Sequence, residues 1–381
     1  MRRQLPVLSV VLAVLIIMVC GCSGGLSPTL PSPDGGGGGD TGTNTITTTS
    51  EGELLPSGLI ADNFQVTLNG DPTVVTQAIP ARIGGLSICF IFDTTGSMGN
   101  AIDGVKESIV EFASEFTDFE KVYWSGMEFG DGTPSDGTNT WDFSFPPTDP
   151  ADLTEGERTL VQPSENLNDL QAWLEGLQAI GGGDGPENPL KALMEAKDTM
   201  VWPEVGARHF IAITDIGAHQ RSDPPPDPQD SYPRPDGEPF CPWMGSEVLA
   251  AFRGWGIIHA VSPDYSGFWT EQEAVAANAP GAEVTPSVII PWAGWDIREL
   301  ADGGPPESRT HEGTGGKWTA LLYGQLIDLT QLGIADLIKQ SYTIVYKRPP
   351  DMVSAHVVIT ATYTEDANPK TATFDLGEVT F

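Results

Sequence analysis

The most regular feature of the sequence is a series of short, continuous apolar runs, each followed by a loop and an amphipathic segment. Residues 86–92 (LSICFIF) and 209–214 (HFIAIT) are runs of this kind, which is typical of strands covered on both faces. Between and after such runs, apolar residues recur at helical spacing. The segments with this spacing are 101–116, 167–180, 188–200 and 318–332. Strands that alternate with helices predict an α/β fold, with a doubly wound, mostly parallel sheet between two helical layers.

The two ends of the globular region have a different pattern. Residues 55–83 and 341–381 contain strand-like runs rich in β-branched residues, with no helical segment between them. Such runs predict antiparallel sheet. We therefore expect a small β-sandwich built from both ends of the chain, with the α/β domain, residues 84–340, inserted between its halves.

The N-terminus has the features of an export signal. Arg2 and Arg3 precede an apolar run that ends at Cys20, which is shorter than the roughly 20 residues a membrane helix needs. Residues 19–22 (VCGC) resemble the lipoprotein box of bacteria, and this resemblance implies a signal peptide over 1–21 and lipidation of Cys22. An uncleaved N-terminal anchor is the alternative. Either outcome places the protein in a bacterial cell envelope, attached to a membrane on its periplasmic face or at the cell surface.

The composition of the chain predicts a linker and restricts the classes of molecule that can be its partner. Residues 22–54 contain almost no large apolar side chains, so we expect a flexible tether after the lipid anchor. The formal net charge of −33 disfavours nucleic acid, whose binding depends on cationic contacts with phosphate. Cys89 and Cys241 remain in the expected mature domain, and the sequence leaves open whether they pair.

Three acidic loops follow predicted strands or lead into predicted helices of the α/β domain. Because ligands of doubly wound sheets bind at the carboxyl ends of the strands, we expect these loops to converge there. Carboxylate and hydroxyl oxygens suit Mg²⁺, Mn²⁺ or Ca²⁺. A position left open on the cation could accept an acidic side chain from a protein partner. The candidate metal ligands are Asp93, Thr95, Ser97, Asp184, Glu187 and Asp215.

Over residues 84–340 the sequence resembles the von Willebrand factor type A (VWA) domain. Residues 93–98 (DTTGSM) match the metal-ion-dependent adhesion motif of that family, 210–219 (FIAITDIGAH) look like its later strand and aspartate loop, and 314–318 (TGGKW) are similar to a late turn. The resemblance implies a Rossmann-like fold whose bound divalent cation mediates protein–protein interaction or adhesion.

The second acidic loop, residues 181–188 (GGGDGPEN), resembles the Asp-x-Pro-Glu form of integrin β subunits. This likeness implies that Glu187 is a metal ligand and that Asp184 belongs to a neighbouring site. Integrin β subunits also carry paired acids just after the first motif. Here those places hold Gly99, Asn100 and Ala101, so the adjacent metal site of integrins is not expected.

We expect the protein not to be an enzyme. The G-x-S-x-G pattern of a nucleophile elbow and a phosphate-binding loop with lysine are both missing from the sequence, and His219 is the only histidine close to the candidate site. A metal-dependent hydrolase and a structural envelope protein with a stabilising metal are the alternatives. Two long insertions, residues 130–159 and 219–246, are expected to carry partner specificity.

Overall fold

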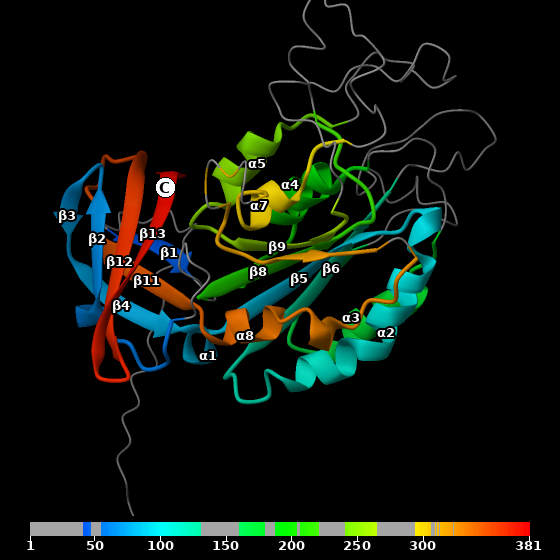
Figure 1. Cartoon of the computed structure of the whole chain (residues 1–381), viewed down its shortest axis with the longest axis horizontal. Coiled ribbons are helices and arrows are strands. Elements are labelled where there is room, and N and C mark those ends of the chain that lie inside the picture. The colour runs from blue at the N-terminus through cyan, green and yellow to red at the C-terminus, as the bar shows by residue number, and fades with distance from the viewer. Residues whose placement is uncertain are drawn as a thin grey trace, which may run out of the picture.

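The computed structural model describes residues 41–46, 55–130, 160–179, 187–203, 206–220, 241–264, 294–305, 309, 311, 313–322 and 324–381. Figure 1 shows an α/β unit beside a smaller all-β unit. Several predicted features lie outside the described residues: the export signal with Cys22, the site residue Asp184 and most of both insertions. Within the described residues, no helix is both long and apolar enough to cross a membrane.

The α/β unit is built on a six-stranded sheet with the strand order β10-β9-β8-β5-β6-β7. All neighbouring strands are parallel except β6 and β7, which are antiparallel. The prediction of a mostly parallel sheet is thus confirmed. The strands are β5 (Leu86–Asp93), β6 (Val122–Phe129), β7 (Leu160–Ser164), β8 (Ala207–Ile213), β9 (Ile257–Ser262) and β10 (Trp318–Ala320).

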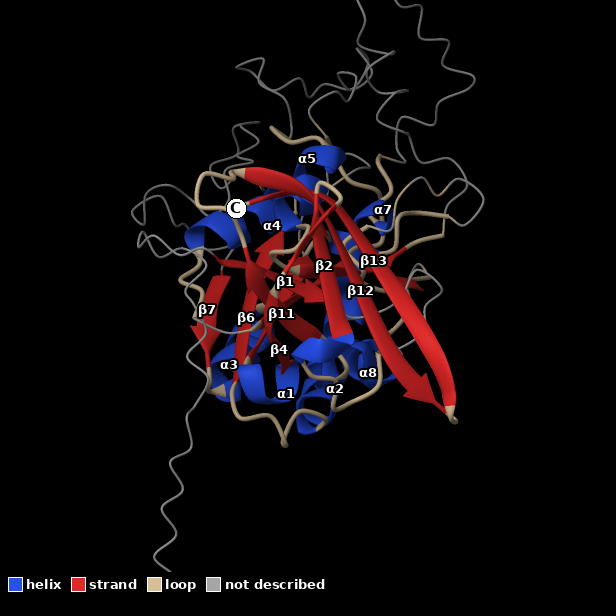
Figure 2. Cartoon of the chain, turned by 90° about the vertical axis from the view of Figure 1, so that its left-hand side faces the viewer, coloured by secondary structure: helices blue, strands red, loops and turns tan. Residues whose placement is uncertain are grey.

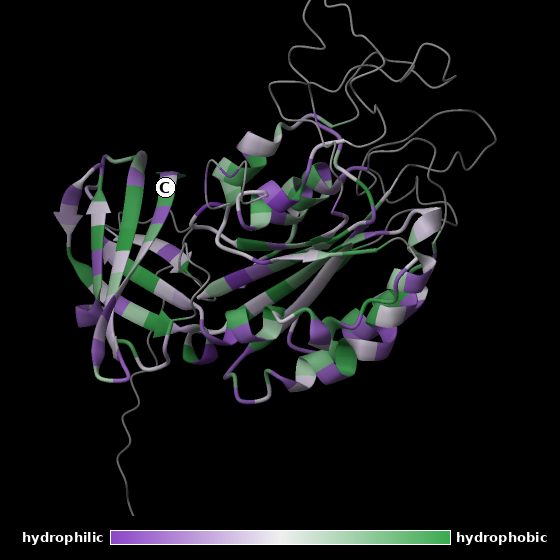
Figure 3. Cartoon of the chain, in the orientation of Figure 1, coloured by the Kyte–Doolittle hydropathy of each residue, from purple (hydrophilic) through white to green (hydrophobic). Residues whose placement is uncertain are grey.

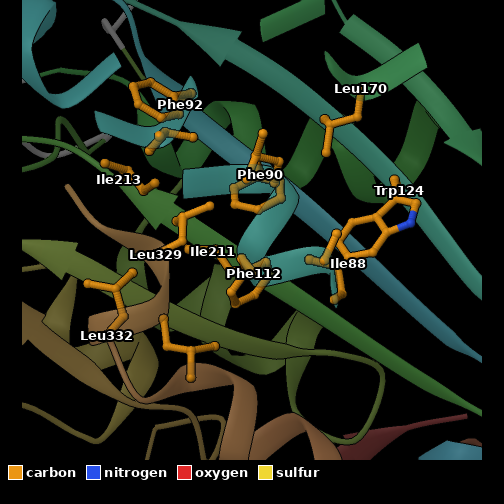
Figure 4. Packing of buried hydrophobic residues seen from close by; sticks show 14 of the residues in the cluster. Ile88, Phe90, Phe92, Phe112, Trp124, Leu170, Ile211, Ile213, Leu329 and Leu332 are labelled. Carbon is orange, nitrogen blue, oxygen red and sulfur yellow. The ribbon is translucent and has the colours of Figure 1, made fainter. Parts of the chain in front are cut away.

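Helices cover both faces of this sheet, as Figure 1 shows. One face packs against α2 (Gly99–Ser114), α3 (Leu167–Gly176), the 3-10 turn η4 (Leu329–Gln331) and α8 (Ile334–Lys339). The other face packs against α4 (Pro189–Thr199), α5 (Gly245–Phe252) and α7 (Arg298–Ala301). Because every residue of β5 and β8 is buried between these layers, their sequences are mostly apolar and do not alternate between apolar and polar residues. Figure 3 shows apolar residues along the strands between the helical layers, and Figure 4 shows Phe112 of α2 in the core with Phe90 of β5 and Ile211 of β8.

The all-β unit consists of two antiparallel sheets around a hydrophobic core of its own. Figure 2, viewed from its side, shows β12 and β13 as a long hairpin. The sheets have the orders β1-β11-β4 and β13-β12-β2-β3 and share one cluster of buried apolar residues. Both therefore combine strands from the two ends of the chain. The strands are β1 (Thr41–Ile46), β2 (Phe64–Leu68), β3 (Asp71–Thr73), β4 (Val75–Pro80), β11 (Tyr342–Lys347), β12 (Ser354–Glu365) and β13 (Asn368–Thr380); the 3-10 turn η1 (Ala61–Asn63) precedes β2, and the short helix α1 (Ala81–Gly84) follows β4.

Two elements differ from what the sequence pattern predicts. The expected linker contains β1, whose threonines and Ile46 pair antiparallel with β11. The helix expected over 318–332 is wrong. Its first residues form the edge strand β10, parallel to β9, and among the described residues of this segment only Leu329–Gln331 form a helical turn. The edge of β9 would have unpaired backbone groups without β10. Hydrogen bonding to these groups favours a strand here, although the apolar residues have helical spacing.

Candidate metal-binding site

The candidate site begins where β5 ends, at the point where the chain reverses its direction of travel across the sheet. The chain proceeds from β5 to β6 on one side, whereas β8 lies on the other side of β5. Such a switch point leaves a crevice outside the carboxyl ends of the two strands. In Figure 1 these ends lie away from the all-β unit, near the start of α2.

Asp93, the last residue of β5, is fully buried and organises the loop that follows it. Its Oδ1 accepts hydrogen bonds from the backbone N–H of Thr95 (2.8 Å) and from the Thr95 hydroxyl (2.7 Å). An aspartate that bonds two residues ahead stabilises a tight turn. The turn continues into the 3-10 helix η2 (Gly96–Met98), and the buried Met98 anchors it in the core. Gly96 and Ser97 are therefore held at the surface.

A second set of hydrogen bonds joins this loop to the end of β8. The Thr214 hydroxyl donates to Asp93 Oδ2 at 2.7 Å, and the Ser97 hydroxyl donates to Asp215 Oδ1 at 3.1 Å. The structure thus brings Asp93, Thr95, Ser97 and Asp215 together, from loops more than a hundred residues apart in the chain. Thr214 was not selected by the sequence analysis. The feature that could have indicated it is a hydroxyl residue directly before Asp215, at the end of a buried strand.

Glu187 lies on a neighbouring segment. Its backbone N–H donates to Gly217 O at 3.0 Å, and the N–H of His219 donates to Glu187 O at 2.6 Å. Ala218, between them, is paired in turn with Trp295. Gly294 allows this close approach, since a Cβ there would lie 2.8 Å from the carbonyl carbon of Gly217 and its φ is +65°. Glu187 is therefore held beside the loop that contains Asp215, and only 3% of its surface is exposed.

Burial makes the two aspartates costly to ionise without a counter-charge. Desolvation raises the pKa of Asp93 to about 7, although hydrogen bonds from Thr95 and Thr214 oppose the shift and the nearby Asp215 adds to it. Desolvation also raises the pKa of Asp215, and the hydrogen bond from Ser97 partly offsets this. A cation bound between these groups would favour their charged forms.

The donor set fits a hard divalent cation. Carboxylate and hydroxyl oxygens are the ligands that Mg²⁺, Mn²⁺ and Ca²⁺ prefer. Asp215 Oδ2 is buried and makes no hydrogen bond within the described part of the chain, so one oxygen remains for a ligand. Among the same residues, no three acidic, histidine or cysteine side chains lie close enough to form a metal cluster. The site therefore combines the carboxylates of Asp93 and Asp215 with the hydroxyls of Thr95 and Ser97, and Glu187 is held on the adjoining segment by its backbone.

Three other residues that the sequence analysis discussed, Asn100, Cys89 and Cys241, lie within the described residues. Asn100 Nδ2, in the first turn of α2, donates to Gly324 O at 2.7 Å. Cys89 and Cys241 are both buried and are not joined by a disulfide, a pairing that the sequence had left open.

Comparisons with known proteins give limited information. We found no protein family whose sequence profile matches the chain, and no curated protein that resembles it in sequence. The structure is similar to that of proximal thread matrix protein 1 from the mussel byssus, described with a zinc-occupied MIDAS motif, at a TM-score of 0.35 and 13% identity. That match covers 71% of this chain and 50% of the mussel protein, so the chain spans about half its length. Because the similarity is this low, we interpret the site from its own geometry.

Proposed function

We propose that the protein binds a divalent cation at this switch point and uses it to hold a protein partner, as VWA domains do. The observation that supports this most directly is the pair of hydrogen bonds, Thr214 to Asp93 and Ser97 to Asp215, which gather oxygen ligands from two loops. Mg²⁺, Mn²⁺ and Ca²⁺ are the candidate ions, and an acidic side chain of the partner would complete the coordination.

The surface beside the site suits contact with a protein. Residues 321–322 and 324–328 run along α2, where Ile327 packs so closely on Gly104 that a Cβ at Gly104 would lie 2.5 Å from the Ile327 backbone. This packing leaves Leu322 and Leu326 exposed at 69% and 56% on either side of the Asn100 contact. Large apolar side chains exposed beside a polar site are typical of interaction surfaces.

We further propose that the protein is an exported lipoprotein, anchored through Cys22 to a membrane of the bacterial envelope. Its acyl chains would anchor the chain without a spanning helix. Replacement of Cys22 by Ser should abolish incorporation of labelled palmitate and release the protein from the membrane fraction. Palmitate labelling that survives Cys22→Ser would contradict this assignment.

Titration calorimetry with Mg²⁺, Mn²⁺ and Ca²⁺ tests the cation site. We expect one-site binding that Asp93→Ala abolishes and that Asp118→Ala, a change in an exposed pair with Arg82, leaves intact. Retention of envelope proteins on the immobilised protein, with and without EDTA, then tests the partner role. Retention should require both the metal and the Leu322 and Leu326 side chains.

The same experiments separate the alternatives. Metal binding that raises stability without any metal-dependent partner would favour a structural role. Hydrolysis of a phosphoester that Asp93→Ala removes would favour an enzyme. We propose neither, because the site supports cation binding and carries no feature specific to hydrolysis in the part of the chain that the structure describes.

A further inference from the structure

Asn188 is a buried polar residue whose side chain has no hydrogen-bond partner in the part of the chain that the structure describes. It is 5% exposed, and neither Oδ1 nor Nδ2 makes a hydrogen bond within the described residues. Buried amides are almost always hydrogen-bonded, so an exception calls for a specific explanation. The residue directly follows Glu187, and sequence reasoning did not select it.

Helix capping does not explain this side chain. Asn188 is the N-cap residue of α4, a position where asparagine normally accepts a hydrogen bond from the first turn. Its φ of −107° and ψ of 45° lie outside the extended conformation that capping uses, and its side chain forms no cap bond. Only its backbone carbonyl serves the helix, accepting from Ala192 N at 3.1 Å.

The position of Asn188 relates it to the cation site. Glu187, its neighbour, is fixed by backbone hydrogen bonds of 3.0 and 2.6 Å to the Gly217–His219 segment, which follows Asp215 directly. Asp215 Oδ2 is another buried oxygen of this region, and it also makes no hydrogen bond within the described residues. Two unpaired oxygens on adjoining segments, one anionic and one an amide carbonyl, form a donor set suited to Mg²⁺ or Ca²⁺.

We infer that Asn188 is a further ligand of the cation site, coordinating through Oδ1 directly or through one bound water. The inference rests on the proposed cation binding and adds a neutral amide oxygen to the carboxylates of Asp93 and Asp215. It assigns a role to a residue that would otherwise lose its hydrogen bonds to water without compensation.

A matched pair of asparagine variants tests the inference. Asn166 is the N-cap of α3, and its Oδ1 does accept from Asn168 N, at 3.2 Å. We expect Asn188→Ala to weaken Mn²⁺ binding about ten-fold or more, while the thermal midpoint of the metal-free protein stays the same or rises. Asn166→Ala should show the opposite pattern, with a lower midpoint and unchanged Mn²⁺ affinity. Asn188→Asp should retain Mn²⁺ binding, because it keeps an oxygen ligand.

The outcomes distinguish this inference from the proposed function. If the wild-type protein binds Mn²⁺ and Asp93→Ala does not, but Asn188→Ala binds as tightly as wild type, the role of Asn188 is overturned and the cation site stands. If the wild-type protein binds no Mn²⁺, Mg²⁺ or Ca²⁺, both proposals fail. A metal-free midpoint that falls in Asn188→Ala as far as in Asn166→Ala would identify Asn188 as a structural residue and also overturn its role as a ligand.

Discussion

Nδ1 of His209 lies 3.0 Å from Nε2 of His259, and the two buried rings are inclined by only 12°. The surrounding hydrogen bonds assign their protons. The N–H of Lys317 donates to His259 Nδ1, so His259 carries its proton on Nε2 and donates it to His209. His209 Nε2 then faces the Ser341 hydroxyl at 3.3 Å, and that hydroxyl donates to Ile338 O. Both histidines are therefore neutral in the folded protein.

This pair predicts acid sensitivity. Burial lowers the pKa of His259 to about 3 and that of His209 well below its ordinary 6.5. Below pH 6.5 the unfolded chain binds protons at these two histidines that the folded chain does not, so their contribution to stability is lost as the pH falls from 6.5 toward 3, while the raised pKa of Asp93 contributes in the opposite direction. We expect His259 alone to cost about 2 kcal/mol between pH 7 and pH 5, as measured by urea unfolding. A variant with His209→Leu and His259→Leu should be less stable at pH 7 and should lose most of this pH dependence; an unchanged dependence would show that other groups cause it.

Cation binding should stabilise the protein. If a cation binds only the folded state, a concentration one hundred times its Kd adds about 2.7 kcal/mol to the free energy of unfolding. We expect Mg²⁺ to raise the thermal midpoint of the wild-type protein and of Asp118→Ala, but not that of Asp93→Ala. An equal rise in Asp93→Ala would place the cation elsewhere.

Thr214 and Ser97 should differ in what they contribute. Thr214→Val leaves Asp93 Oδ2 buried without its 2.7 Å hydrogen bond, which should destabilise the metal-free protein by about 1–3 kcal/mol. Ser97 is exposed, so Ser97→Ala should change stability little and should weaken cation binding. Urea unfolding and calorimetry on both variants measure the difference. If Ser97→Ala is the more destabilising change, this division of roles is wrong.

Gly104 should control the position of the segment that carries Leu322 and Leu326. A methyl group at Gly104 would lie 2.5 Å from the backbone N and O of Ile327, so Gly104→Ala must displace that backbone from α2. We expect faster hydrogen exchange in residues 324–329 and weaker partner retention. Cation affinity should change little, because Asp93 and Asp215 lie outside the displaced segment. Unchanged exchange would mean that α2 shifts instead.

How much the sequence could predict depended on the kind of interaction. The strands β5 and β8 were predicted because burial on both faces favours a nearly continuous run of apolar residues. Strand β10 was not, since its pairing uses backbone groups of β9 that leave no mark on its own sequence. At the site, the motif indicated Asp93, Ser97 and Asp215. The role of Thr214 could not be predicted because it depends on a hydrogen bond to Asp93 on the neighbouring strand. Asn188 could not be predicted because only the absence of side-chain hydrogen bonds within the described residues distinguishes it.

If the chain is tethered at Cys22 as proposed, strand β1 has a mechanical consequence. A pull on that tether would reach the described fold at Thr41, whose strand is held by β11 along its whole length. Thr45 Oγ1 also donates to Gly206 O at 3.1 Å, just before β8, and Asn44 bonds the Tyr346 hydroxyl. Load would therefore be carried first by β1 and β11, at the end of β8 opposite Asp215. If a partner also holds the protein at the proposed cation site, tension between membrane and partner would pass through the pairing of β1 with β11, and separation of these two strands is the first change expected under load.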